Sequence, residues 1–284
     1  ISMKFEQIMP SATTMADATL PTVAMDTEAG TQYNVLHGYT SELDSTLFYG
    51  NITPVAKDRK LTVTINTYGE DIEGVAYKIR SLEDKSLIEN TEVSDYDNAG
   101  SSINVTFNIK NLLDTGKEYA LEVVLKTKKH EAVYYYTRIV YGVDYDLQKK
   151  LDFVMDFNAC TFDDSRLKDI SGYLETSSSG DNTNYGKVNI NCSLSQVGWG
   201  DLDPYVESDI MPEVISVDDD VAILRLSYRV GAANDYSSSD TYTVSEYYRI
   251  RQTNSGFYLL NFEREMNQVF DARNDLTSTA KINL

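Results

Sequence analysis

Imidazole and thiol groups are the first side chains to consider for chemistry, and the sequence holds few of them. It has two histidines, His37 and His130, and two cysteines, Cys160 and Cys192. A Ser-His-Asp or Cys-His site needs an imidazole beside the nucleophile, yet both cysteines follow both histidines in the other half of the chain. One disulfide could form, but the pattern favours two separate buried thiols, surface histidines and no zinc site. We expect no catalytic residue.

Carboxylates are the second candidates, because oxygen-rich loops bind calcium and paired carboxylates hydrolyse glycosides. Acidic residues cluster at 201–209 and at 218–220, but neither cluster has EF-hand spacing. A chain of net charge −19 forms such clusters by chance, and one tryptophan is few for a glycosidase cleft. No glycine-rich phosphate loop lies between a strand and a helix. We therefore expect no enzyme activity, no metal and no cofactor.

Trp199 is the most unusual single residue, because it lies between two glycines in the loop that runs from Val197 to Tyr205. One interpretation is a plug that packs against the body of the protein, since tryptophan is usually buried. The other is an aromatic contact for a sugar or a protein. Trp199 and Tyr205 are therefore candidate ligand-binding residues.

The first half of the chain has the two-residue rhythm of half-buried antiparallel strands. Short strands are expected at 22–25 and 33–39, and a connecting loop at 40–50. Five clearer strands follow, separated by turn signals, and this spacing indicates a β-sandwich. They are expected at 61–66, 72–82, 103–109, 119–125 and 133–140.

A leucine at 112 or 113, then Gly116, then Tyr119 and alternating apolar residues form a more specific pattern. It resembles the entry into the sixth strand of fibronectin type III and immunoglobulin-like domains, over residues 55–141. In those domains the tyrosine hydroxyl bonds to upstream backbone in a "tyrosine corner". The resemblance implies a structural role for Tyr119.

After Val143 the rhythm becomes helical, with apolar residues spaced to form one helix face. A helix is expected from Asp146 to Ala159, capped by Asp144 or Asp146, and a shorter one from Asp164 to Tyr173. Strands are then expected at 188–194, 212–217, 221–230, 242–252 and 257–263, and a frayed tail from Asp271.

This element order resembles the NTF2-like (cystatin-like α+β) superfamily over residues 146–265. The matching pieces are 153–160, 166–170, 217–228 and 247–262. Such domains wrap a curved sheet around a helix and often leave a pocket, so the resemblance implies Asp156 and Tyr228 as pocket residues. The expected fold is therefore mainly β with α+β: an Ig/Fn3-like sandwich domain with an irregular N-terminal segment at 1–143, and an NTF2-like domain at 144–284.

The charge balance limits the partners, because 44 acidic against 25 basic residues repel nucleic acid and anionic membranes. No apolar stretch is long enough to span a bilayer. The opening Ile1-Ser2-Met3 indicates a fragment whose anchor or signal was removed. We expect a non-enzymatic, extracytoplasmic binding or spacer region of a larger membrane- or wall-anchored bacterial protein at the cell surface. Its partner would be a protein or a cell-wall glycan. The alternatives are a small-ligand-binding NTF2-like pocket domain and a carbohydrate-binding module.

Overall fold

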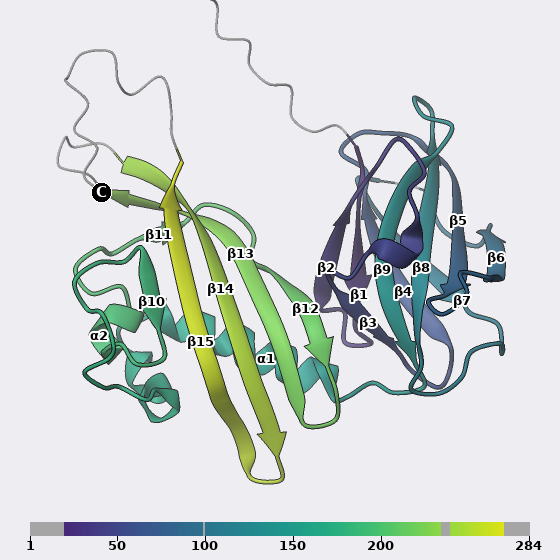
Figure 1. The fold of residues 1–284 in the computed structure, drawn as a ribbon. Helices are drawn as coiled ribbons and strands as arrows, with labels where there is room; N and C mark the ends of the chain where they lie inside the picture. The colour runs from purple at the N-terminus through teal and green to yellow at the C-terminus, as the bar shows by residue number, and fades with distance from the viewer. Residues whose placement is uncertain (1–19, 99, 234–238, 270–284) are drawn as a thin grey trace, which may run out of the picture.

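The computed structural model describes residues 20–98, 100–233 and 239–269. The predicted frayed tail and most of the predicted irregular N-terminal segment lie outside these ranges. The described chain is built mainly from β-strands arranged in three sheets, with few helices (Figure 1). The prediction of a mainly β protein is confirmed. None of the described helices has the length and hydrophobicity needed to span a membrane.

Strands before residue 143 form two sheets that pack face to face (Figure 1). The four-stranded sheet has the order β2 (Gln32–His37), β1 (Thr22–Asp26), β4 (Lys60–Asn66), β7 (Ser102–Asn108). The five-stranded sheet has the order β3 (Ile52–Val55), β9 (Val133–Tyr141), β8 (Glu118–Thr127), β5 (Ile72–Ser81), β6 (Leu87–Val93). Only β3 and β9 pair in parallel among these strands.

The alternating pattern of the sequence explains the core between these two sheets. Leu61, Val63 and Ile65 on β4 are buried because successive strand residues point to opposite faces. Tyr77 on β5 and Phe107 on β7 meet between the sheets, with ring centroids 4.7 Å apart. The two sheets are therefore held by interdigitating apolar side chains.

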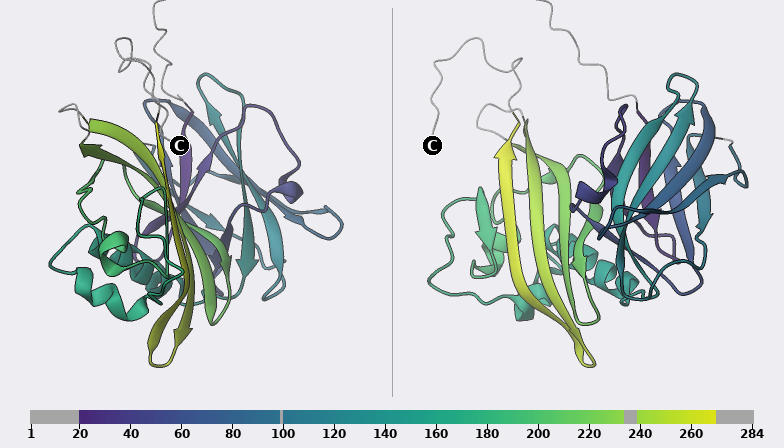
Figure 2. Two further views of the ribbon diagram at one scale, coloured as in Figure 1. Left: turned by 60° about the vertical axis from the view of Figure 1, so that its left-hand side comes forward. Right: turned by 45° about the vertical axis from the view of Figure 1, so that its right-hand side comes forward.

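Strands after residue 143 form the third sheet, which is strongly curved (Figure 2). Its order is β10 (Lys187–Asn189), β15 (Gly256–Gln268), β14 (Ser239–Thr253), β13 (Val221–Ala233), β11 (Tyr205–Val206), and β12 (Met211–Val217) also pairs with β13. Helix α1 (Leu147–Thr161) crosses one face of this sheet and buries Leu151, Val154 and Phe157 against it. The remaining helical segments are η1 (Ser45–Leu47), η2 (Leu167–Tyr173) and α2 (Leu194–Val197).

Several local predictions were wrong. The two short strands β3 and β6 were not expected, because neither has a clear alternating pattern. The strand predicted at 188–194 ends at Asn189, and Ser193 begins α2 instead by accepting a hydrogen bond from the Gln196 N–H. Of the two predicted capping residues of α1, Asp146 makes no cap hydrogen bond with its side chain, which accepts from Lys149 and Gln252 instead. Oδ1 of Asp144 accepts a hydrogen bond from the N–H of Asp146 at 3.1 Å.

Candidate functional site

The side chain of Asn34 joins the third sheet to the first two. Its Oδ1 accepts a hydrogen bond from the N–H of Val214 on β12 at 2.7 Å. Its Nδ2 donates to the carbonyl of Ile52 at 2.9 Å and to Oγ1 of Thr53 at 3.0 Å, both on β3. Asn34 is fully buried and its φ is 49°, a left-handed conformation that asparagine tolerates better than most residues. One buried amide thus connects β2, β3 and β12, and β2 and β12 lie side by side (Figure 1).

Further polar contacts surround this junction. The register of β12 shifts between Val214 and Ser216, and the carbonyl of Ile215 there accepts a hydrogen bond from Arg138 at 3.5 Å. Gln148 at the start of α1 accepts a hydrogen bond from Thr27 at 2.5 Å and donates one to Thr31 at 2.9 Å. The strands before and after residue 143 are therefore joined by specific hydrogen bonds.

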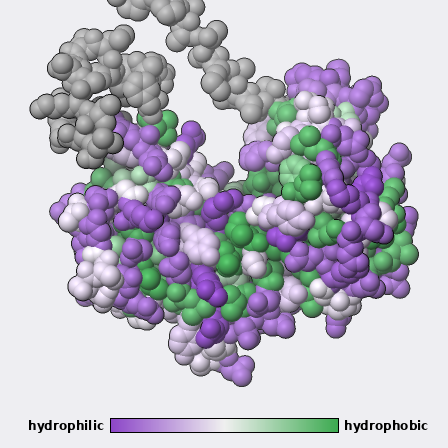
Figure 3. All heavy atoms as spheres, viewed as in Figure 1, coloured by the Kyte–Doolittle hydropathy of each residue, from purple (hydrophilic) through white to green (hydrophobic). Residues whose placement is uncertain are grey.

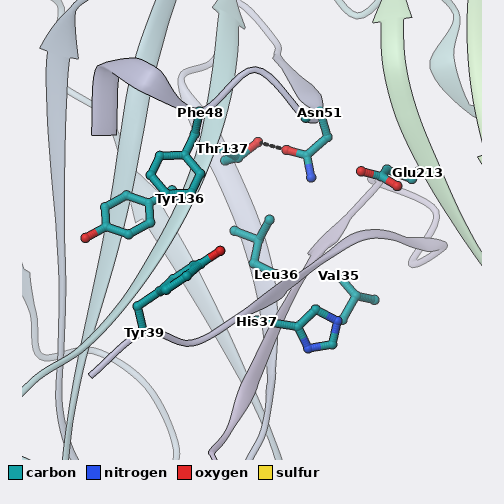
Figure 4. Close-up of a pocket in the computed structure, with 10 residues that line it drawn as sticks. Val35, Leu36, His37, Tyr39, Phe48, Asn51, Tyr136, Thr137 and Glu213 are labelled. Carbon is teal, nitrogen blue, oxygen red and sulfur yellow. Dashed lines mark hydrogen bonds between the residues drawn. The ribbon is translucent and has the colours of Figure 1, made fainter. Parts of the chain in front are cut away.

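A cleft of about 200 Å³ opens beside this junction (Figure 4). We call it the interface cleft, because β2, β9, the β2–β3 connection and β12 all contribute to it. Its lining residues are Val35, Leu36, His37, Tyr39, Phe48, Gly50, Asn51, Tyr136, Thr137 and Glu213.

Aromatic rings form one wall of the interface cleft. Phe48 stacks on Tyr136 with centroids 4.4 Å apart, and Tyr39 lies 5.8 Å from both rings. The hydroxyl of Tyr136 accepts a hydrogen bond from the Leu43 N–H at 2.7 Å, and burial raises the pKa of Tyr136 to about 12. This wall is therefore held in place by ring packing, and the Tyr136 hydroxyl remains neutral at physiological pH.

Polar groups form the other side of the cleft. Oδ1 of Asn51 accepts a hydrogen bond from Thr137 at 2.5 Å, whereas its Nδ2 has no partner among the described residues. Glu213 on β12 is paired with Arg225, with nitrogen–oxygen distances of 2.9 and 2.5 Å. The Thr137 hydroxyl donates its one hydrogen to Asn51 and also lies 3.1 Å from the carbonyl oxygen of Arg138, and neither of these oxygens is a base that could activate it. This arrangement suits binding better than nucleophilic chemistry.

Trp199 lies away from this cleft and is 1% exposed. The guanidinium of Arg264 lies 3.4 Å from the centroid of the Trp199 ring. The φ angle of Trp199 is 69°. The flanking glycines leave room for close packing, because a Cβ at Gly198 would collide with Leu167 and one at Gly200 with Tyr185. This is the packed arrangement that the plug interpretation describes.

The other candidate ligand-binding residues are not gathered in one place. Tyr205 is 52% exposed, and its ring covers Gly231 on the neighbouring strand β13. Asp156 points to solvent and pairs with Arg166 at 2.5 Å. Tyr228 is buried on β13 and donates a hydrogen bond to Glu246 at 3.0 Å. Only Tyr228 therefore belongs to a buried polar cluster.

Glu246 is the centre of that cluster, which we call the Glu246 cluster. Asn158, Tyr228 and Tyr248 donate hydrogen bonds to its carboxyl group at 2.8, 3.0 and 2.7 Å. Arg264 lies 3.8 Å away and is also fully buried. Burial, followed by the nearby Glu246, raises the pKa values of Tyr228 and Tyr248.

Arg264 connects the Glu246 cluster to the Trp199 loop. Its two terminal nitrogens donate to the carbonyls of Val197 and Gln196 at 2.8 and 3.0 Å. Nε of Arg264 and Nε1 of Trp199 are buried without a hydrogen-bond partner. The sequence held a signal for this cluster, because Glu246 occupies the buried register of β14 together with Val244, Tyr248 and Ile250.

Three further predicted groups can be placed. The hydroxyl of Tyr119 accepts a hydrogen bond from the N–H of Asp114 at 2.8 Å, which is the kind of upstream backbone contact that the resemblance implies. Cys160 and Cys192 are buried and unbridged. Within the described ranges, no three His, Cys, Asp or Glu side chains are placed to hold a metal ion together.

Comparisons with known proteins give little guidance. No protein-family model and no curated protein matches this chain. Among solved structures, the sporulation control protein Spo0M from Bacillus subtilis aligns over 77% of this chain and 86% of its own, with 8% sequence identity. The TM-score of that alignment is 0.24, too low to support an argument about fold or function.

Proposed function

We propose that this chain is a non-enzymatic binding and spacer region of a larger bacterial protein that is anchored in the membrane or cell wall. Its place would be outside the cytoplasm, at the cell surface. Its partners would be a protein or a cell-wall glycan. The net charge of −19 supports a role away from nucleic acid and anionic lipid.

The proposal includes two domains, an Ig/Fn3-like sandwich at 1–143 and an NTF2-like domain at 144–284. The strand orders β1-β4-β7 and β9-β8-β5-β6 support the first, because they match the two sheets of such sandwiches. The curved sheet with α1 on one face supports the second. Among the described residues, no strand of the first two sheets pairs with a strand of the third.

The observation that carries the spacer role is the buried hydrogen bond between Asn34 and Val214. Domains that move relative to one another usually meet through small, polar interfaces. Here a fully buried amide and a 2.5 Å contact between Thr27 and Gln148 cross the junction. Such contacts hold the two parts at a fixed orientation, which is what a spacer requires.

The rigidity is tested by double electron–electron resonance between spin labels at Leu87→Cys on β6 and Asn254→Cys on the β14–β15 turn. Both sites are exposed, whereas the native cysteines are buried. A single narrow distance distribution is expected for the doubly labelled protein. A broader distribution is expected when the doubly labelled protein also carries Asn34→Ala. A broad distribution in the parent protein would contradict the spacer role.

The location is tested on cells that produce the full-length protein. Protease added to intact cells is expected to digest this region, while a cytoplasmic marker remains whole. Protection of the region until the cells are lysed would contradict an extracytoplasmic location.

The small-ligand alternative keeps one supporting observation, namely the unpartnered nitrogens of Arg264 and Trp199 beside the Glu246 cluster. Against it, Phe157 and Leu226 are buried in the core and Phe153 stacks on Phe257 at 4.8 Å. A ligand there would displace packed side chains. Trp199 is the chain's one tryptophan, so a ligand in that place should change the intrinsic fluorescence. An unchanged spectrum across a metabolite panel would remove this alternative.

A further inference from the structure

We propose that the interface cleft binds one ring of a neutral saccharide. This inference deepens the binding role proposed above and rests on it. It concerns a site that neither Trp199 nor Tyr205 lines.

The size of the cleft limits the ligand. Pockets for drug-sized molecules commonly enclose about 300–1,000 Å³, whereas the interface cleft has about 200 Å³. Leu36 and Val35 supply an apolar floor, and Leu36 is 4% exposed. A cleft of this size accommodates one sugar ring of an oligosaccharide, while the adjacent sugar rings stay in solvent.

The hydrogen-bonding groups of the cleft are mixed, and this argues for hydroxyl groups on the ligand. The Nδ2 of Asn51 is a donor, the carboxyl of Glu213 is an acceptor, and the hydroxyl of Tyr39 is both. Figure 4 shows these groups around one open space, with the imidazole of His37 at its edge. An anion would need a cleft lined by hydrogen-bond donors alone, and an ammonium group would need one lined by acceptors alone. Sugar hydroxyl groups use both donors and acceptors.

Charge also favours a neutral ligand. The guanidinium of Arg225 already balances Glu213 at 2.9 and 2.5 Å, which reduces the attraction of the cleft for an organic cation. The net charge of −19 opposes binding of an anion. Figure 3 shows hydrophilic residues over much of the face seen in Figure 1, with hydrophobic residues interspersed among them.

The aromatic wall supplies the apolar contact that the carbon–hydrogen face of a sugar ring requires. Tyr39 is 43% exposed, so part of its ring is free to meet a ligand. Phe48 and Tyr136 pack behind it at 5.8 Å and hold its orientation. An aromatic ring with a polar tip can stack and hydrogen-bond at once.

The junction between the sheets completes the site. Glu213 is the residue before Val214, whose N–H is held by Asn34. The same buried hydrogen bond that fixes the two parts therefore places the acceptor of β12 opposite the aromatic wall of the first two sheets.

The inference is tested with the whole chain on an array of neutral hexose and N-acetylhexosamine oligosaccharides, followed by saturation-transfer NMR with the free sugars that bind. Binding of at least one neutral saccharide is expected. Tyr39→Ala and Asn51→Ala should each weaken it by about tenfold or more, which corresponds to about 1.4 kcal/mol. Tyr258→Ala is the matched control, because Tyr258 is 55% exposed on β15 and does not line the cleft, and it should leave binding unchanged.

Absence of binding to every saccharide would overturn the inference, and so would binding that both cleft variants retain. Binding of tetramethylammonium or of a short peptide in this cleft, with no sugar bound, would also overturn it. If Tyr39→Ala fails to fold, Asn51→Ala and Tyr39→Phe carry the test, since Tyr39→Phe keeps the ring and removes only the hydroxyl. If no saccharide on the array binds but the spin-label distance distribution is narrow, the saccharide inference fails and the spacer role is retained. The failure of the inference can therefore be told apart from the failure of the proposed function.

Discussion

Oδ1 of Asn34 accepts a hydrogen bond from the backbone N–H of Val214, 180 positions later in the chain, at 2.7 Å inside the protein. The same amide donates two further hydrogen bonds to β3, so no polar atom of this side chain is left unpaired. Because the Asn34 side chain and the Val214 N–H are buried, loss of the amide removes the side-chain acceptor of that N–H and leaves it shielded from water.

We predict that Asn34→Ala lowers the free energy of unfolding by about 2–4 kcal/mol, because a buried unpaired group costs about 1–3 kcal/mol and the left-handed φ adds strain. Urea denaturation measures this change. Asn34→Gly isolates the hydrogen bonds, since glycine accepts a φ of 49° without strain. The matched control is Asn254→Ala at the exposed β14–β15 turn. Equal stability of the Asn34 variants and the control would contradict the role assigned to this amide.

Removal of one member of the Glu246–Arg264 pair should destabilise the protein more strongly. Arg264→Leu would leave the Glu246 carboxyl group buried without its cation. It would also remove the hydrogen-bond donor of the Val197 and Gln196 carbonyls. We expect a loss of about 3–5 kcal/mol, as for other buried pairs that lose one partner. Chemical denaturation followed by fluorescence measures it.

The fluorescence of Trp199 gives a second readout of Arg264→Leu. Since the ring is 1% exposed and stacked on Arg264, the folded parent should emit at short wavelength and resist acrylamide quenching. The variant should show a changed spectrum before unfolding begins. The Glu246→Leu/Arg264→Leu double variant is expected to recover part of the stability, because it removes both charges. A double variant less stable than Arg264→Leu would contradict this account.

Tyr119→Phe removes one hydroxyl and leaves the ring. The N–H of Asp114 then loses its acceptor at 2.8 Å. We expect a loss of about 1 kcal/mol, the usual net contribution of one hydrogen bond. Thermal unfolding by circular dichroism measures it, and Tyr258→Phe, at a tyrosine that is 55% exposed, serves as the control. A loss equal to that of the control would show that this hydroxyl has no structural role.

Alkaline pH should unfold the protein. Burial raises the pKa values of Tyr33, Tyr77, Tyr135 and Tyr248 above the ordinary value of about 10. In the unfolded chain these phenols lose protons near pH 10, while the folded protein keeps them. The unfolded state therefore binds fewer protons above pH 10, and stability falls as pH rises.

The measurement is a spectroscopic titration of tyrosinate absorbance together with circular dichroism. Exposed tyrosines should ionise first without unfolding, and the buried ones should ionise together with loss of the β-sheet signal. Lys150 and Arg264 act in the opposite direction, because burial lowers their pKa values. They are outnumbered by the buried tyrosines, which also include Tyr136 and Tyr228. Full ionisation of all tyrosines with the sheet signal intact would contradict the prediction.

The sequence by itself determined the β-rich fold and much of the element order. Alternation along β4, β5, β7, β8 and β9 predicted their strands because one buried face repeats every two residues. The change to helical spacing after Val143 predicted α1 to within two residues at each end. Short elements such as β3 and β6 escaped prediction, because their partners, and not their own pattern, keep them extended.

Only the tertiary structure decided which polar residues meet. Asn34 and Val214, or Glu246 and Arg264, carry no mark in the sequence that pairs them, since hydrogen bonds depend on where distant strands come to lie. The same holds for the interface cleft, whose wall and acceptor come from segments on either side of α1. Periodicity records which face of a strand is buried, whereas the neighbour on that face is set by how whole sheets pack.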